Sequence, residues 1–437
     1  MDDFNNKTYV KRRKEISKLM ESNSCFLINS ANLKFRNNDS SYFFRQDSNF
    51  YYLSGFVEPD SLIMIENNGK STLFCRERNL ELEKWDGFMH GVDGAKKTFG
   101  FDECFDITEK ENLIPEMIKG KTNLYCLIGK DKNFDASVSS WVNKANNLER
   151  HQANIDIKNF SNELGMMRLI KDEHELSLMR KSCEIAAKAH KKALMNIKKG
   201  MSEFDIESLY LNYFREGGSN FPSYTPIVAG GSNACILHYI ENNKTIKESD
   251  LVLVDAGCEY NYYASDITRT FPVSGKFSAE QKAIYEVVLE AHKKSTEAIV
   301  VGNSCMNPQK TSEEVISQGL KDLGFLKEPL EEILEKKLFR EFYYHKIGHW
   351  IGLDVHDDSP YTYKDEEIKF KENMIMTIEP GIYINESAPV DSKWKGIGIR
   401  IEDDILATNK GPINLTNEVP SRSDEIEQLM SKKCINR

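Results

Sequence analysis

Four apolar segments of this 437-residue chain each carry a carboxylate where a buried strand is expected. The acidic residues are Asp255 in LVLVDAG, Asp266 in SDITRTF, Glu379 in MTIEPG and Glu402 in GIGIRIEDDIL. A lone carboxylate is costly to bury, and several together repel one another and take up protons. The fold must therefore bring a compensating positive charge to these acids, and few other features of the sequence constrain it as strongly.

The local patterns place these acids at particular points of the strands. LVLVDAG predicts a buried strand that ends in Asp255, and SDITRTF predicts an alternating strand that begins near Asp266. Glu379 follows an apolar run and is expected at a strand end, whereas alternation places Glu402 in the middle of its strand. Because acids at the ends of neighbouring strands can face the same point, we expect the four carboxylates to converge.

A pair of divalent cations would remove the repulsion, and four acids suit two cations better than one. Hard oxygen ligands favour manganese over a metal that prefers thiolates. Hydrolytic two-metal centres hold their ions roughly 3.5–4 Å apart. Any one of these acids alone would more simply be a surface residue or an ion-pair partner, for example of Arg400. Four acids on separate apolar segments favour the metal centre.

Three of the nine histidines lie in the segment HKIGHWIGLDVH, as His345, His349 and His356. One interpretation is a zinc protease helix of the H-E-x-x-H type, whose catalytic glutamate follows the first histidine. Here that position is Lys346, the third histidine comes one position late, and two glycines weaken a helix. The segment is therefore expected to contribute one histidine to the carboxylate site.

Length, charge and cysteine content limit the number of domains, the kinds of partner and the cellular location that the sequence allows. The length predicts two domains, and a net charge of −10 argues against a nucleic-acid or anionic-membrane partner. No signal-peptide core and no run of about 18 apolar residues is present in the sequence. The nine cysteines form no C-x-x-C pair, so reduced thiols and a cytoplasmic location are expected.

The order of predicted elements separates two domains. Residues 1–170 alternate helices and strands, with strands expected at 49–56, 61–66, 71–77 and 123–129 and helices at 10–20 and 138–150. A long amphipathic pattern at 171–194 and a capped pattern from Ser202 predict two helices that open the second domain. From residue 224 strands dominate, so residues 171–437 are expected to form an α+β domain with mixed or antiparallel strands.

Several segments, in order and across nearly the whole chain, resemble the pita-bread metallopeptidases and among them the Xaa-Pro aminopeptidases (aminopeptidase P). They are FFRQDSNFYYLSGFVEPD, ILHYIENN, LVLVDAGCEYNYYASDITRTFPV, HKIGHWIGLDVHD, TIEPGIYI and GIGIRIEDDIL. The resemblance implies a pita-bread (creatinase/aminopeptidase-like) domain at 171–437. It also implies a smaller α/β domain at 1–170 of the aminopeptidase P type, which serves oligomerisation and closes the site.

The same resemblance implies a centre of two Mn²⁺ ions per chain, with Co²⁺ and Zn²⁺ as alternatives. Asp255 would hold one metal, Asp266 and Glu402 would bridge both, and His349 and Glu379 would complete the set of ligands of the second metal. A bridging hydroxide would attack the substrate. Glu379 would carry its proton to the leaving proline nitrogen, as general acid–base catalysis requires.

Further roles follow from the resemblance. The residues expected to act in catalysis beside Glu379, or to contact or support the substrate site, are His238, His345, His356, Tyr383 and Arg400. Trp85 is expected either to reach a neighbouring subunit's active site or to pack in the core. The segment DDSPYTYKDEEIKFKEN lacks an arginine that relatives use beyond the proline, and Lys364 is the expected replacement.

The implied function is hydrolysis of the bond between an N-terminal residue and a following proline, by a homo-oligomer (dimer or tetramer). The proline nitrogen of such a bond carries no hydrogen, so active sites that hydrogen-bond an extended substrate backbone bind it poorly. The alternatives are an Xaa-Pro dipeptidase (prolidase) and a non-catalytic pita-bread binding protein. Creatinase-like enzymes lack this acid set, and methionine aminopeptidases lack the first domain.

Overall fold

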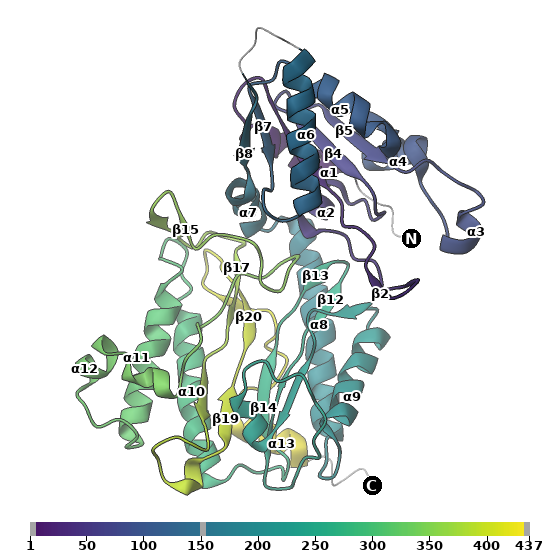
Figure 1. Ribbon diagram of the computed structural model, residues 1–437. Coiled ribbons are helices and arrows are strands. Elements are labelled where there is room, and N and C mark those ends of the chain that lie inside the picture. Colours follow the sequence, from purple (N-terminus) through teal and green to yellow (C-terminus); the bar gives the residue numbers. More distant parts are fainter. Residues whose placement is uncertain (1–5, 149–153, 432–437) are drawn as a thin grey trace. The chain divides into compact units, whose positions relative to one another are not determined.

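The computed structural model describes residues 6–148 and 154–431, and the chain divides into two compact units, Met1–Met167 and Arg168–Arg437 (Figure 1). The sequence analysis placed the division three residues later, after residue 170. In the described ranges, no helix has both the length and the apolar composition that crossing a membrane requires. The eight cysteines in these ranges are free thiols, and Cys434 lies outside them.

The first unit is built around one six-stranded sheet with parallel and antiparallel pairs, as expected for an α/β domain. Helices α5 (Lys110–Ile118) and α6 (Lys132–Leu148) share a buried cluster with Leu27 and Met64 of the sheet. The strands in sheet order are β6 (Glu103–Asp106), β5 (Ser71–Cys75), β4 (Leu62–Glu66), β1 (Ser24–Asn29), β7 (Asn123–Cys126) and β8 (Asp156–Asn159). The remaining elements are α1 (Lys7–Ser17), α3 (Glu83–Asp86), α4 (Gly91–Phe99), α7 (Ser161–Leu169) and the β2–β3 pair (Phe35–Asn37, Ser40–Ser41).

The strand predicted at residues 49–56 is wrong, because this segment forms helix α2 (Ser48–Ser54). Asp47 caps the helix by accepting the N–H of Phe50 at 2.9 Å. Gly55, with φ of 65°, ends it in the left-handed conformation. All seven helix residues are buried, so the apolar run carries no polar face that would distinguish a helix from a strand.

Two helices open the second unit, as predicted: α8 (Glu173–Asn196) and α9 (Glu203–Glu216). Each begins with a capping box, Asp172 with Glu175 and Ser202 with Asp205. Figure 1 shows the strands of this unit between α8 and α9 on one side and α10 and α11 on the other. The later helices are α10 (Ala279–Glu297), α11 (Asn307–Asp322), α12 (Leu330–Glu335) and α13 (Ser423–Ser431).

Every strand pair described in the second unit is antiparallel, as the α+β prediction allows. Asp255 ends β11 and lies opposite Thr268, the first residue of β14. Among the described strands, three sheets have three strands each: β10 (Ile227–Gly230), β11 (Leu251–Asp255) and β14 (Thr268–Pro272); β13 (Tyr263–Ala264), β12 (Cys258–Tyr260) and β9 (Phe221–Pro222); and β17 (Ile375–Ile378), β20 (Asp403–Leu406) and β21 (Ile413–Asn414). Two further sheets have two strands each: β18 (Gly381–Ile384) with β19 (Ile397–Arg400), and β15 (Thr362–Tyr363) with β16 (Glu366–Glu367).

The prediction that Glu402 lies in the middle of a strand is wrong. The chain leaves β19 at Arg400 and enters β20 at Asp403, so Glu402 occupies the step between two sheets. The partner strands are interrupted at the same level, because β17 ends at Ile378 and β18 begins at Gly381. The side chains of Glu379 and Glu402 therefore extend from two strand interruptions that face each other.

Arg269 fixes the backbone at this interruption. Its guanidinium is fully buried and donates to the Glu402 carbonyl at 2.7 Å and to Asp403 Oδ1 at 2.8 Å. It also donates to the carbonyls of Val419 and Pro420. Burial raises the pKa of Asp403, but Arg269, His292 and Thr416 together outweigh burial and hold that pKa well below its usual range.

We expect Arg269→Met to lower the free energy of unfolding by about 3–5 kcal/mol, because it leaves the Asp403 charge buried with less compensation. Urea unfolding followed by circular dichroism measures the change. Arg422→Met is the matched control, since Arg422 forms an exposed pair with Asp424 and its loss should change the midpoint little. Equal effects of the two substitutions would contradict this role of Arg269.

Candidate metal centre

A cavity of about 560 Å³ in the second unit collects the predicted site residues. Its wall includes all five expected metal ligands together with four of the residues expected to act on substrate. These residues are Asp255, Asp266, His349, Glu379 and Glu402, and His238, His345, His356 and Arg400. Residues distant along the chain therefore meet at one cavity, as the sequence analysis predicts.

Backbone pairing brings His349 next to Glu379. The segment before β17 runs beside that strand: Thr377 donates to the His349 carbonyl at 2.9 Å, and Glu379 donates to the Ile347 carbonyl at 2.7 Å. Gly348 makes this approach possible, because a Cβ there would lie 1.9 Å from the Thr377 carbonyl oxygen. The side chains of His349 and Glu379 consequently emerge together, with Nε2 and Oε1 3.7 Å apart.

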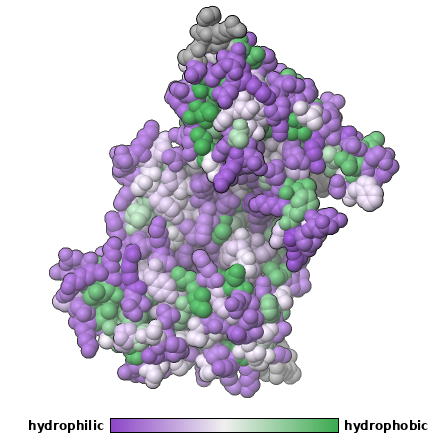
Figure 2. Space-filling model, in the orientation of Figure 1, coloured by the Kyte–Doolittle hydropathy of each residue, from purple (hydrophilic) through white to green (hydrophobic). Residues whose placement is uncertain are grey.

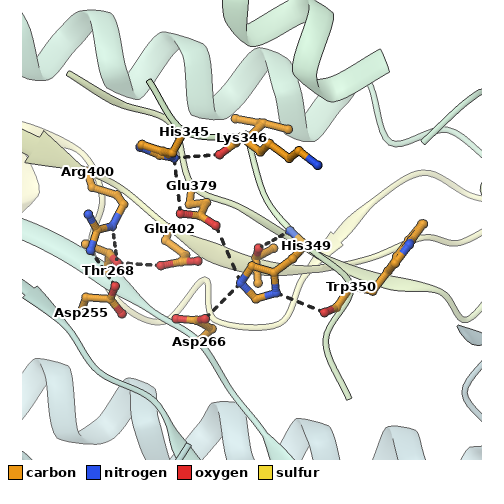
Figure 3. A network of polar contacts seen from close by, with 12 residues as sticks. Asp255, Asp266, Thr268, His345, Lys346, His349, Trp350, Glu379, Arg400 and Glu402 are labelled. Atoms are coloured by element: carbon orange, nitrogen blue, oxygen red, sulfur yellow. Dashed lines mark hydrogen bonds and ion pairs between the residues drawn. The ribbon is translucent and has the colours of Figure 1, made fainter. Parts of the chain in front are cut away.

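Three of the predicted ligands form a compact donor group. Asp266, His349 and Glu402 each offer an atom that lies within 4.8 Å of the other two. His349 Nε2 is 3.4 Å from Asp266 Oδ2. Figure 3 shows these side chains and Glu379 pointing toward one another. Oxygen and imidazole donors in this number suit a divalent cation such as Mn²⁺.

The orientation of the His349 ring is set by its other nitrogen. Nδ1 lies 3.1 Å from the Trp350 carbonyl, which can only accept, so Nδ1 carries the proton and Nε2 faces the acids. Metal-binding histidines are commonly held in this way. Burial lowers the pKa of His349, but Asp266 and Glu379 raise it to about 9 overall.

The acids of the cavity are held in an environment that disfavours their charge. Burial raises the pKa of Glu379 to about 7 and the pKa of Glu402 well above its usual range. Burial and the nearby Asp255 also raise the pKa of Asp266. Carboxylates that repel one another in this way fit a site completed by divalent cations.

Sequence reasoning missed Tyr224, which lines the same cavity. Its hydroxyl is 2.5 Å from Asp266 Oδ1 and also contacts Asp255, so it can donate its single proton to either carboxylate. Tyr224 lies in an irregular segment between β9 and β10, and no local pattern distinguishes it from a packing tyrosine. It orients the two aspartates and belongs to the site.

Arg400 connects several parts of the site. Its Nη2 pairs with Asp255 Oδ2 at 2.6 Å, and its Nε donates to Thr268 Oγ1 at 3.2 Å. Thr268 in turn donates to Glu402 Oε2 at 2.6 Å. The guanidinium therefore orients one carboxylate directly and another through the threonine hydroxyl.

His345 is a neutral hydrogen-bonding group. Its Nδ1 donates to the Lys346 carbonyl at 2.8 Å, so Nε2 accepts from the Tyr383 hydroxyl at 2.8 Å. Burial and the Arg400 charge lower the pKa of His345 to about 3. Tyr383 is fully buried and also accepts from Arg400 at 3.0 Å. Its position suits support of these two side chains better than the direct substrate contact that was expected.

The two remaining histidines of the site are exposed at the cavity. The ring of His356 packs edge-on against His349, with 4.3 Å between the centroids. The next residue, Asp357, is buried and pairs with Lys171 at 3.0 Å and with Arg168. Arg168 also pairs with Asp354 at 2.6 Å. This buried charge cluster, which the sequence analysis did not anticipate, fixes the loop that carries His356.

Two further predictions concern residues outside this cavity. Trp85 lies in α3 of the first unit with 86% of its surface exposed, so the alternative of a core tryptophan is wrong. Lys364 lies in the turn between β15 and β16 with φ of 51°. The lysine on the cavity wall is instead Lys346.

Comparisons with known proteins cover both units. Residues 177–409 match metallopeptidase family M24, and residues 9–125 match the aminopeptidase P N-terminal domain. The Xaa-Pro aminopeptidase of Haemophilus influenzae is 42% identical over 97% of each chain. The structure of Pseudomonas aeruginosa aminopeptidase PepP is 40% identical, with a TM-score of 0.96 and 100% of each chain covered. Zinc-substituted Escherichia coli aminopeptidase P in complex with product is 36% identical, with a TM-score of 0.94 over 99% of each chain.

The raised pKa values predict how pH affects the metal-free protein. Groups with raised pKa values hold protons in the folded state that the unfolded chain releases, so their contribution to stability is lost as pH rises. For Glu379 this loss lies between about pH 4.5 and 7, and for His349 it lies between about pH 6.5 and 9. The raised pKa of Glu402 adds a loss of the same sign.

We therefore expect the protein in chelator to unfold at a lower temperature at about pH 8.5 than at about pH 7. Saturating Mn²⁺ should reduce this dependence, because cations bind the deprotonated ligands. Thermal unfolding by calorimetry measures both effects, and His349→Gln should flatten the dependence in chelator, because the raised pKa of His349 spans this range. A metal-free protein that becomes more stable over this range would contradict the electrostatic description of the site.

Proposed function

Because the chain belongs to metallopeptidase family M24, we propose that it is a metal-dependent Xaa-Pro aminopeptidase. The second unit has the pita-bread fold of that family, and the first is an aminopeptidase P N-terminal domain. Its substrates are peptides with proline at the second position. The proposal is supported by relatives named Xaa-Pro aminopeptidase that match over almost the full length.

The observation that carries the proposal is the meeting of all five expected ligand residues at one cavity. Two Mn²⁺ ions are the cofactors that this donor set suits best, with Co²⁺ and Zn²⁺ as the alternatives. The residues that would hold these ions are Asp255, Asp266, His349, Glu379 and Glu402. Such ions would acidify a water molecule and polarise the substrate carbonyl.

The chain's own residues supply the proton transfers and the orientation of the substrate. Glu379 takes a proton on a carboxylate oxygen and delivers it to the leaving proline nitrogen, as general acid–base catalysis requires. His356 and His238, exposed at the cavity, contact the peptide. Burial and the Arg400 charge keep His345 neutral, so it brings no positive charge to the substrate. Arg400 holds Asp255 in position.

Two other functions are known for proteins with this fold. A prolidase would use the same five ligands but accept only dipeptides. A pita-bread protein that only binds its partner is disfavoured because all five ligand positions are filled here. The free thiols of the described cysteines support a cytoplasmic location, where thiols are kept reduced.

We expect the chelated enzyme to lose activity and to regain it with Mn²⁺, cleaving the bond before proline in both Ala-Pro and Ala-Pro-Ala. Release of alanine, followed by chromatography, measures turnover. Glu379→Ala should remove turnover, by at least about a hundredfold given the usual size of acid–base contributions, while the fold stays intact. Cleavage of the dipeptide alone would favour the prolidase. Full activity without metal would exclude the proposed chemistry.

The first unit is proposed to mediate assembly into a homo-oligomer, in which Trp85 helps to close a neighbouring subunit's site. The support is an apolar surface at α3, visible in Figure 2, that includes Leu80, Trp85 and Phe88, with 64%, 86% and 68% of their surfaces exposed. Exposed apolar side chains gathered in this way commonly mark interfaces.

A double substitution tests the proposed interface. Trp85→Ser with Phe88→Ser should shift the protein toward the monomer in analytical ultracentrifugation, since both remove apolar contact area. Phe204→Ser is the matched control, because Phe204 is exposed to a similar degree in the second unit (54%). A monomeric unsubstituted protein, or an unchanged oligomer after the double substitution, would contradict the proposal.

A further inference from the structure

The wall of the cavity carries one cationic side chain that has no acidic partner. Lys346 lines the cavity and is exposed, and across residues 6–148 and 154–431 no carboxylate lies within ion-pair distance of its ammonium group. The other permanent cation of the wall, Arg400, is buried and bound to Asp255. Asp357, an acid of the same wall, is already paired with Lys171 and Arg168. The charge of Lys346 is therefore available to a ligand.

An aromatic support positions the ammonium group of Lys346. Its Nζ lies 5.5 Å from the centre of the Tyr361 ring. That ring stacks on Trp350 with 5.6 Å between the centroids, and its hydroxyl accepts the Trp350 backbone N–H at 3.2 Å. Tyr361 is thus fixed by two contacts, and it presents a rigid surface on which the lysine side chain rests.

The direction of the side chain separates it from the reacting atoms. Figure 3 shows Lys346 extending away from Glu379 and Glu402, while its carbonyl accepts from His345. A group that meets the ammonium is consequently not at the bond being cleaved. The acids proposed as metal ligands line the same cavity, so the wall near Lys346 differs from their surroundings in the sign of its charge.

We propose that Lys346 is a specificity-determining residue that attracts a carboxylate of the peptide substrate at a position remote from the cleaved bond. This inference rests on the proposed aminopeptidase function. An ammonium acts as a point charge and accepts a carboxylate in many orientations. The carboxylate belongs to the C-terminus of a dipeptide, to an acidic side chain after the proline, or to an acidic first residue.

The test compares three matched pairs of substrates that differ by one negative charge. The pairs are Ala-Pro with Ala-Pro-amide, Ala-Pro-Asp-amide with Ala-Pro-Asn-amide, and Asp-Pro-Ala-amide with Asn-Pro-Ala-amide. The manganese-loaded full-length enzyme and its Lys346→Met, Lys346→Arg and Lys364→Met variants are assayed. Lys364 is the matched control because it is a lysine over a tyrosine ring, that of Tyr363, in a turn outside the cavity wall.

We expect Lys346→Met to lower the charged-to-neutral ratio of kcat/KM for at least one pair, by about two- to fivefold, as for other exposed charge pairs. The change should lie in KM rather than in kcat, because the contact is made equally in the ground state and the transition state. Lys346→Arg should retain the ratio, Lys364→Met should leave it unchanged, and added salt should reduce the preference of the unsubstituted enzyme. The pair that responds identifies the position of the carboxylate.

Unchanged ratios for all three pairs in Lys346→Met would overturn the inference, as would an equal change in Lys364→Met. These outcomes are distinct from failure of the proposed function. If the unsubstituted, manganese-loaded enzyme cleaves none of the six peptides, the aminopeptidase assignment fails. If it cleaves them with ratios that ignore Lys346, only the role of this lysine is lost.

Discussion

Mutual repulsion among buried carboxylates is the constraint on which the rest of the catalytic unit depends. Asp266, Glu379 and Glu402 are drawn together by the backbone, and burial raises the pKa of each. Neighbouring groups offset part of this repulsion: Arg400 pairs with Asp255, and the Tyr224 hydroxyl bonds to the aspartates. Divalent cations would neutralise the repulsion that remains. The cluster of carboxylates that is unfavourable without metal therefore supplies the ligands that bind the metal.

The geometry that creates this repulsion comes from two interrupted strands. β17 and β18 are separated at Glu379, and the facing strands β19 and β20 are separated at Glu402. At such an interruption a side chain is freed from the strict alternation of a continuous strand. Arg269 is buried and donates to the Glu402 carbonyl at this interruption. A buried cation therefore fixes the backbone from which the Glu402 side chain extends.

Much of this site can be read from the sequence, and the rest cannot for identifiable reasons. Asp255 was predictable because an apolar run that ends in an acid marks a strand end. The change of sheet at Glu402 was not predictable, because the alternation of apolar and polar residues continues in the sequence where the chain leaves one sheet and enters the next. Tyr224 and the partners of Asp357 were missed because their contacts join segments far apart along the chain. The seven buried residues of α2 show the same limit, since a run without a polar face fits a helix or a strand.

The buried pairing of Arg168 and Lys171 with Asp357 also determines how far the catalytic unit extends. Arg168 is the first residue of that unit, yet its partner lies 189 positions later in the loop that carries His356. A fragment cut at residue 171 would retain every side chain of the cavity wall but remove one of the two cations that neutralise Asp357. Any autonomous version of the peptidase unit must therefore begin upstream of Arg168, within the helix that ends the preceding unit.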